Sequence, residues 1–315
     1  MSKIAFIYPG QGAQKASMGA DFYENSEIAR YIFDQAGEEL DLDMKELCFE
    51  ENDRLDLTEY TQAAMVTTCL AMTRVAESKG LKADITAGLS LGEYPAIAAA
   101  GGMNDMDAIR LVRKRGILMQ NTVPAGEGAM CAVISMAAEE IEKVIEPIAD
   151  VSVANYNCPG QIVITGKTDA VEEAAAKLKE AGARRTIMLN VSGPFHSQML
   201  VPAGEKLAEE LEHTRFHELR IPYVTNVTAE KVTDIRETPG LLTTQISSPV
   251  RWMQSMERMI ADGVDTFVEI GPGKTLEGFL RKIDRSVKVF HISQWEDVDK
   301  VCTELADSGK MMEEA

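Results

Sequence analysis

Short apolar segments alternate with longer amphipathic ones along most of this 315-residue chain. Residues 4–8 and 85–87 are candidates for buried strands, and residues 58–79 and 105–121 have the pattern of helices. Strands that alternate with helices indicate a mostly parallel sheet that is covered on both faces. The pattern therefore predicts the α/β fold class. Further strands are expected at 223–227, 266–270 and 287–292, and further helices at 201–211, 249–261 and 275–283.

The middle of the chain has a different order of elements. Strands are expected at 128–136, 151–155, 161–165 and 184–191, with helices at 138–148 and 169–181. This β-α-β-β-α-β order is typical of a ferredoxin-like unit, whose two inner strands pair through the turn at 157–160. We therefore expect a small ferredoxin-like domain over residues 126–192. It would be inserted into a large, discontinuous domain formed by residues 1–125 and 193–315.

An excess of acidic residues argues against nucleic acid as a partner. Asp and Glu number 50 against 32 Lys and Arg, which gives a formal net charge of −18. Such a surface repels a polyphosphate backbone. The longest weakly polar stretch, residues 96–103, is far shorter than the ~20 residues that cross a bilayer. The first apolar run ends at Pro9, before a secretory core could form, so we expect a cytoplasmic protein that does not enter membranes.

The cysteines are scattered and never spaced as a CxxC pair, so reduced and mostly buried thiols are expected. Neither a disulfide framework nor a zinc site fits this spacing, and we expect no metal and no cofactor. The five cysteines are Cys48, Cys69, Cys131, Cys158 and Cys302.

The strongest local signal is a Gly-x-Ser-x-Gly motif at residues 88–92, between an expected strand and an expected helix. In that context the serine lies on a tight turn and presents its hydroxyl at the carboxyl edge of the sheet. Glycines on either side allow the backbone to close without a steric clash. Ser90 is therefore a candidate nucleophile. The alternative is a serine that only caps the following helix.

A serine nucleophile needs a base, and the chain has only four histidines. His213 and His217 could share a helix face, but no further Cys or His stands near them to complete a metal site. His291 lies in an apolar strand and is expected to be a packed residue. His196 lies in a loop at the seam between the two expected domains, and it is the best candidate for the general base.

The loop at residues 10–14 follows the first expected strand and is rich in glycine. It could cradle a phosphate, although it matches neither of the usual phosphate-binding motifs. Alternatively, one of its backbone amides could supply the second donor of an oxyanion hole. Both possibilities place the loop at the carboxyl end of the sheet.

Five motifs in order resemble the malonyl-CoA:acyl-carrier-protein transacylase family and the related acyltransferase domains of polyketide synthases. The resemblance covers residues 4–292 and implies an α/β-hydrolase-like domain with an inserted ferredoxin-like one. The motifs are Gln-Gly-Ala-Gln at 11–14, Gly-Leu-Ser-Leu-Gly-Glu-Tyr at 88–94, Arg-Gly at 115–116 with Met-Gln at 119–120, Gly-Pro-Phe-His-Ser at 193–197 and Glu-Ile-Gly-Pro-Gly at 269–273.

The resemblance implies a role for each matching residue. Ser90 matches the nucleophile, His196 the base, and Arg115 the arginine that pairs with the malonyl carboxylate. The other matches are the oxyanion-hole amides of Gln11 and Leu91, the Gln245 main-chain carbonyl that orients the histidine, and the cleft residues Asn155 and Asn157. Without the resemblance, the basic run 113–115 would be taken as a solvated helix face.

The resemblance also implies a reaction. The malonyl group passes from malonyl-CoA to Ser90 and then to the phosphopantetheine thiol of acyl carrier protein, in a ping-pong sequence that supplies fatty-acid synthesis. Phe195 would narrow the pocket against a branched acyl group. One departure is Leu89, where many members have His. Carrier proteins are acidic, so we expect a local basic patch drawn from Lys114, Arg184, Arg185, Lys274, Arg281 and Lys282.

Three other functions are compatible with the same sequence features. A serine thioesterase or carboxylesterase would share the turn around Ser90, but it would usually place an acidic residue behind the histidine. An acyltransferase of a polyketide synthase would carry out the same transfer. A non-catalytic subunit that binds carrier protein or acyl-CoA would not need the Ser90 hydroxyl.

Overall fold

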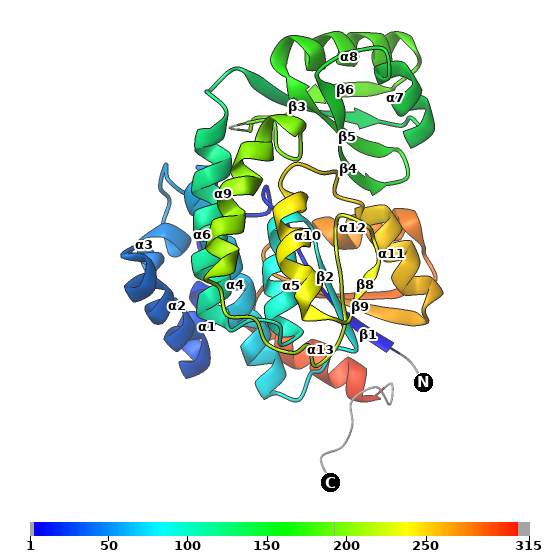
Figure 1. Ribbon diagram of the computed structural model, residues 1–315. Helices are drawn as coiled ribbons and strands as arrows, with labels where there is room; N and C mark the ends of the chain where they lie inside the picture. The colour runs from blue at the N-terminus through cyan, green and yellow to red at the C-terminus, as the bar shows by residue number, and fades with distance from the viewer. Residues whose placement is uncertain (1–2, 192, 308–315) are drawn as a thin grey trace.

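A six-stranded sheet with the order β10-β9-β1-β2-β7-β8 forms the centre of the larger lobe. The computed structural model describes residues 3–191 and 193–307, and Figure 1 shows both lobes. All neighbouring strands of this sheet run parallel except β7 and β8. The fold is therefore mixed α/β with a mostly parallel sheet. The strands are β1 (Lys3–Tyr8), β2 (Ile85–Gly88), β7 (Tyr223–Val224), β8 (Lys231–Val232), β9 (Val264–Ile270) and β10 (Lys288–Ile292).

Helices cover both faces of this sheet because its central strand is apolar on both sides. Phe6 and Tyr8 of β1 pack into one hydrophobic cluster, and Ile7 packs into another. This alternation is the two-residue period of a strand. The first face is covered by α2 (Glu27–Leu40), α4 (Thr58–Ser78), α5 (Glu93–Ala99), α6 (Asp105–Thr122), α9 (Val201–Glu212) and α13 (Trp295–Asp307), and the second by α11 (Trp252–Ala261) and α12 (Thr275–Ile283).

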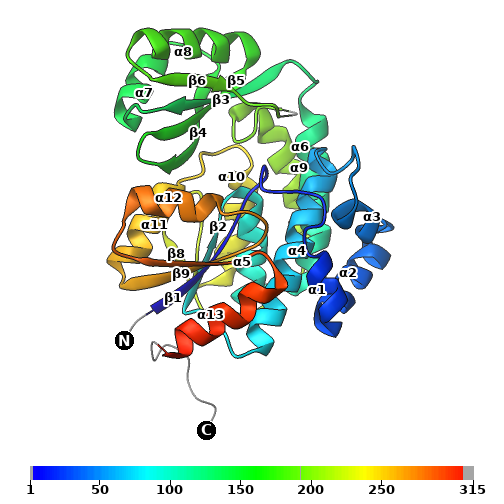
Figure 2. The ribbon, with the colours of Figure 1, turned by 180° about the vertical axis from the view of Figure 1, so that it is seen from behind.

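The smaller lobe is an antiparallel sheet with the order β4-β5-β3-β6. Its strands are β3 (Gly128–Ile134), β4 (Val151–Cys158), β5 (Gln161–Lys167) and β6 (Arg185–Met188), and its helices are α7 (Ala138–Ile145) and α8 (Thr168–Glu180). Figure 2 shows α12 of the larger lobe directly below this sheet, on the side of β4. The lobes are also joined by backbone hydrogen bonds, because Val250 donates to Ala154 and accepts from Tyr156.

The order of the expected strands and helices is confirmed, but several bounds differ. The strand expected at 151–155 continues to Cys158, because it stays paired with β5 as far as the Cys158–Gln161 pair. Val250 forms a bridge with Asn155, so the helix expected at 249–261 begins at Trp252. Three short helices were not expected: α1 (Ala20–Asn25), α3 (Met44–Phe49) and α10 (Thr238–Gln245). The expected domain boundary at 192 and the last eight residues of the expected large domain, 308–315, lie outside the described residues.

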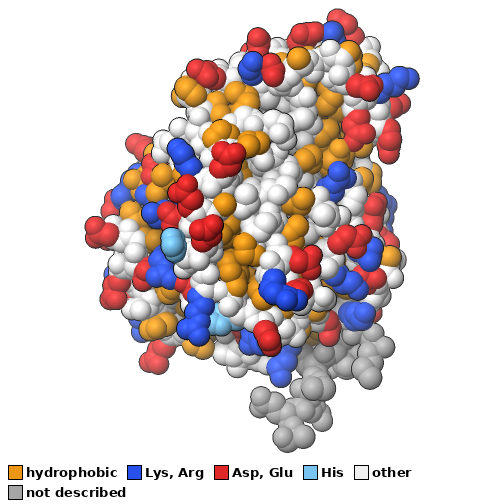
Figure 3. Space-filling model, in the orientation of Figure 1, with side chains coloured by type: hydrophobic (Ala, Val, Ile, Leu, Met, Phe, Trp, Pro, Cys, Tyr) orange, Lys and Arg blue, Asp and Glu red, His pale blue; other side chains and the backbone are white. Residues whose placement is uncertain are grey.

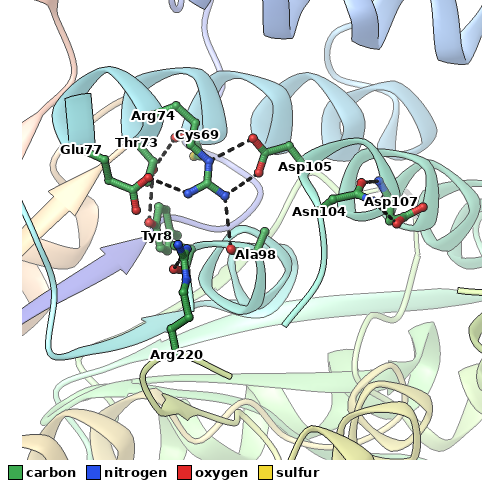
Figure 4. A network of polar contacts seen from close by, with 11 residues as sticks. Tyr8, Cys69, Thr73, Arg74, Glu77, Ala98, Asn104, Asp105, Asp107 and Arg220 are labelled. Carbon is green, nitrogen blue, oxygen red and sulfur yellow. Dashed lines mark hydrogen bonds and ion pairs between the residues drawn. The ribbon is translucent and has the colours of Figure 1, made fainter. Parts of the chain in front are cut away.

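Arg74 of α4 forms hydrogen bonds and ion pairs that connect α4 with α5 and α6 (Figure 4). From α4 it donates to both carboxylate oxygens of Asp105 at the start of α6, at 2.6 and 3.0 Å. It also donates to Glu77 at 2.6 Å and to the carbonyl of Ala98 near the end of α5, at 3.2 Å. These contacts fix α5 and α6 relative to α4. Both helices carry residues of the site described below.

All five cysteines are free thiols, and all but Cys302 are buried. Among the described residues, we find no helix with the length and hydrophobicity needed to cross a bilayer.

Candidate active site

Ser90 lies on a sharp turn between β2 and α5, where its backbone adopts a left-handed conformation with φ of 55°. The flanking glycines make this turn possible. A Cβ at Gly88 would lie 1.8 Å from the carbonyl oxygen of Gly92, and a Cβ at Gly92 would lie 2.4 Å from the carbonyl oxygen of Tyr8. No other residue fits either position. The two glycines therefore allow Ser90 to adopt a backbone conformation that costs an L-residue about 1–2 kcal/mol.

Ser90 Oγ lies 2.8 Å from His196 Nε2, although the two residues are 106 positions apart. The opposite ring nitrogen, His196 Nδ1, lies 2.9 Å from the carbonyl oxygen of Gln245. A carbonyl only accepts hydrogen bonds, so Nδ1 carries the proton and Nε2 is free to accept from the Ser90 hydroxyl. Burial and, secondarily, the charge of Arg115 lower the pKa of His196 to about 4. The imidazole is therefore neutral at physiological pH and able to take a proton.

Arg115 of α6 is completely buried, with 0% of its surface exposed. Its guanidinium donates to Gln62 Oε1 at 2.7 Å, to Gln245 Oε1 at 3.0 Å and to Ser90 Oγ at 3.1 Å. All three acceptors are neutral, and no carboxylate of the described residues forms an ion pair with it. Burial lowers the pKa of Arg115. A solvated helix face is therefore the wrong interpretation for Arg115, which holds a buried charge with no direct carboxylate partner beside the serine.

The glycine-rich loop after β1 lies against the Ser90 turn. A Cβ at Gly10 would lie 2.6 Å from Leu89 Cδ2, and the Leu89 amide donates to the carbonyl of Tyr8 at 3.0 Å. The Gln11 side chain donates to Thr58 Oγ1 at 3.0 Å. Leu91 is buried immediately after the serine, in the short 3₁₀ turn that leads into α5. Leu91 thus follows Ser90 directly, and Gln11 lines the same cavity as Ser90 from a different segment.

Ser90 and His196 line a cavity of about 610 Å³ between the two lobes. The smaller lobe contributes apolar and amide side chains, among them Met130, Asn155 and Asn157, and the larger lobe contributes Phe195. Asn155 and Asn157 are buried, and Asn157 Oδ1 has no hydrogen-bond partner among the described residues. The site is therefore a partly apolar cavity whose lining includes the Ser90 hydroxyl and the His196 imidazole.

Two buried side chains behind Ser90, those of Asn226 and Glu93, were not among the predicted site residues. Asn226 accepts from the Ser90 amide and donates to the Gly88 carbonyl, both at 2.7 Å. Glu93 accepts from the Gln245 side chain at 2.7 Å and from the Asn226 amide at 3.1 Å. Burial raises the pKa of Glu93 to about 7. For Glu93 the signal was its place directly after the serine motif. For Asn226 there was no such signal, because residue 226 lay within the strand expected at 223–227, whereas β7 ends at Val224.

The other histidines lie away from Ser90. His213 caps the end of α9, so it does not share a helix face with His217 in the following loop. His291 of the edge strand β10 lies 3.6 Å from Glu277.

Three cations of the expected basic patch have polar partners, since Lys114 pairs with Glu210, Arg281 with Glu277, and Lys282 donates to Gln161. Basic and acidic side chains are interspersed on the face shown in Figure 3. A basic patch for carrier protein thus stays a prediction.

Comparisons with known proteins place this geometry among acyl transferases. The profile of the acyl transferase domain family matches residues 5–298. A malonyl CoA-acyl carrier protein transacylase of Bacillus subtilis is 44% identical over 304 residues, which cover 95% of this chain and 96% of that protein. A crystal structure of the transacylase of the same name from Clostridium perfringens is 42% identical, with a TM-score of 0.94 and 98% of each chain covered. A malonyl-transacylase solved in complex with its type II polyketide synthase acyl-carrier protein is 35% identical, with a TM-score of 0.93 over 96% of this chain and 100% of that one.

Proposed function

Because this chain belongs to the acyl transferase family, among relatives named malonyl CoA-acyl carrier protein transacylase, we propose that it transfers malonyl groups from malonyl-CoA to acyl carrier protein. The acceptor is the phosphopantetheine thiol of the carrier protein, and the product supplies malonyl units for fatty-acid synthesis. The observation that carries this function is the contact of one hydroxyl, that of Ser90, with both a neutral imidazole and a buried guanidinium.

The first half of the reaction acylates the serine. His196 Nε2 takes the Ser90 proton as Oγ attacks the thioester carbonyl of malonyl-CoA. The tetrahedral oxyanion is held by the backbone amides of Leu91 and Gln11, where one donor typically contributes ~3 kcal/mol to lowering the barrier. His196 then gives its proton to the departing CoA sulfur. The Gln245 carbonyl keeps the imidazole in the tautomer that this step needs.

The second half reverses these roles with a different thiol. His196 Nε2 takes a proton from the phosphopantetheine thiol of carrier protein, and the sulfur attacks the malonyl-serine ester. The oxyanion forms at the same two amides, and Ser90 leaves with the proton from His196. Because both halves pass through one covalent intermediate, the kinetics are ping-pong.

Arg115 selects the acyl group. Its guanidinium is buried among neutral acceptors, so the terminal carboxylate of a malonyl group supplies the missing negative charge. A charge-assisted, forked pair of this kind is among the stronger polar contacts in proteins. An acetyl group would leave the cation unpaired, which costs of order 1–3 kcal/mol. Phe195 lines the same cavity and limits the space for a branch next to the thioester.

A thioesterase is less compatible with this geometry. The group behind His196 is the Gln245 carbonyl, and Glu93 contacts Gln245 and Asn226 but not the imidazole. The arginine would also have no function in a pocket for neutral esters.

The fold supports a matching division of the chain. The larger lobe, residues 1–125 and 193–315, is an α/β-hydrolase-like catalytic domain, and residues 126–192 form a ferredoxin-like domain. The strand order β4-β5-β3-β6 and the helices α7 and α8 support the second assignment. The enzyme acts in the cytoplasm, where malonyl-CoA and carrier protein meet.

Intact-mass measurement after mixing with malonyl-CoA tests this function. The unaltered protein should gain one malonyl group, which apo carrier protein leaves in place and holo carrier protein removes. Ser90→Ala should gain nothing, and Arg115→Ala should lose the preference for malonyl-CoA over acetyl-CoA. Rapid release of free malonate without an adduct would indicate a hydrolase. An unmodified protein that still binds carrier protein would indicate a non-catalytic subunit.

A further inference from the structure

The left-handed backbone conformation of Ser90 must be stabilised by contacts from other parts of the chain. A left-handed serine between two glycines relaxes easily, because glycine adds no side-chain packing and has a wide choice of dihedral angles. Relaxation by a fraction of a turn would move Oγ away from His196 Nε2. The groups that prevent it must therefore bind the backbone on both sides of the turn.

Asn226 binds the N-terminal side of this turn with a single side chain. Its Oδ1 accepts from the Ser90 amide and its Nδ2 donates to the Gly88 carbonyl, so the carboxamide bridges the backbone that leads into Ser90. Both distances are 2.7 Å, which is short for a neutral amide pair. The residue itself is 1% exposed, so water does not compete for these bonds.

Asn226 is in turn fixed by its own backbone. Its amide donates to Glu93 Oε2 at 3.1 Å, and its carbonyl accepts from the Arg251 amide at 3.0 Å. The Gln245 side chain donates to the Ser90 carbonyl at 3.0 Å and to the same Glu93 oxygen at 2.7 Å. In a trans peptide the C=O and the following N–H point in opposite directions, so this bond also sets the direction of the Leu91 amide.

We propose that Asn226 is a positioning residue for acyl transfer, which holds the Gly88–Ser90 backbone so that the Ser90 hydroxyl meets the substrate carbonyl. This inference rests on the proposed function. Asn226 acts on no substrate atom. Its effect passes through the nucleophile, so it changes the rate of the chemical steps and leaves substrate binding nearly unchanged.

Replacement of Asn226 by alanine should separate these two effects. We expect the rate of malonyl-serine formation to fall about 100-fold, the cost typical of a reacting group misplaced by about 1 Å. The KM for malonyl-CoA should change less than about threefold, because Arg115 and the cavity are untouched. Asn25→Ala is the control: it removes the side-chain hydrogen bond of an asparagine in α1, a helix that contributes no residue to the lining of the cavity, and should leave the acylation rate unchanged.

Asn226→Asp should make the acylation rate depend on pH in a way that a general loss of stability would not. A protonated Asp keeps one donor and one acceptor, whereas an ionised one places a negative charge against the Gly88 carbonyl. The charged or titratable side chains around this frame are Glu93 from α5, Arg115 from α6 and His196 from the loop before α9. All three are present in both proteins, so the ratio of variant to unaltered rate reports the change at position 226 together with its coupling to Glu93. That ratio should rise at least fivefold between pH 8 and pH 6.

The reactivity of Ser90 can also be measured with a neutral sulfonyl fluoride, which does not require malonyl-CoA to be the substrate. If the unaltered protein reacts with the sulfonyl fluoride but forms no malonyl adduct, the proposed function fails while the role of Asn226 is still measured. Equal labelling rates in Asn226→Ala and the unaltered protein would overturn the inference. If Asn226→Ala does not fold, a pH-independent ratio for Asn226→Asp would overturn it instead.

Discussion

The Ser90 hydroxyl should react with a neutral sulfonyl fluoride nearly as fast at pH 5 as at pH 8, because His196 stays unprotonated over that range. Burial and the neighbouring Arg115 charge lower the pKa of His196 from 6.5 to about 4. At pH 5 a histidine with a pKa of about 4 is about 90% neutral, whereas one with the ordinary value is about 3% neutral. The two cases differ about 30-fold in the population of active base.

The assay is the pseudo-first-order rate of labelling, followed by intact mass between pH 5 and pH 8, with Ser90→Ala as the background. In Arg115→Met the guanidinium charge is gone, so the pKa of His196 should rise but stay below its ordinary value, since burial is the larger cause. Labelling of that variant should therefore fall between pH 6 and pH 5. A 30-fold fall in the labelling rate of the unaltered protein between pH 8 and pH 5 would show that the pKa of His196 is not lowered. Identical pH profiles for the two proteins would show that Arg115 does not contribute to lowering it.

Three further changes test the frame around the site. Glu93→Gln should raise the free energy of unfolding by up to about 3 kcal/mol at pH 8 and should leave it unchanged at pH 4. The folded-state pKa of Glu93, about 7, exceeds the unfolded value of 4.5, so the cost of burying its charge grows as the pH rises between these values. Equal gains in urea melts at both pH values would contradict this. Gly88→Ala should abolish acylation, since its Cβ would lie 1.8 Å from a carbonyl oxygen, while Gly278→Ala in α12, with no atom within 4 Å, should keep it and gain up to ~1 kcal/mol. Arg74→Met should lower stability by about 2 kcal/mol by leaving two partly buried carboxylates unpaired, and an unchanged melting curve would show that the network is dispensable.

Local patterns predicted the alternation of strands and helices and the turn around Ser90, because each depends on residues close together in sequence. Bounds failed where a distant segment intervened. The helix expected to begin at residue 249 begins at Trp252, because Val250 pairs with β4 of the other lobe. No periodicity within the helix itself carries that information.

The residues of the candidate site also depend on contacts between segments that are far apart in the sequence. The basic run around Arg115 looks solvated by composition, yet Arg115 is buried because Gln62 of α4 and Gln245 of α10 meet its guanidinium. Asn226 lies 136 residues from the serine whose backbone it binds. An asparagine at a strand end is common, and only the folded chain shows that its amide bridges the backbone that leads into Ser90.

Arg115 has two effects on the site, and they are coupled through the substrate. In the free enzyme its charge helps to keep His196 neutral, but it also makes the imidazole a weaker base. A malonyl carboxylate bound to Arg115 offsets that charge, so the pKa of His196 should move back toward its usual range only when the correct acyl group is present. An acetyl group offers no such compensation. Selection at Arg115 should therefore appear in the acylation rate constant as well as in the KM, and a variant that lacks this charge should lose both differences together.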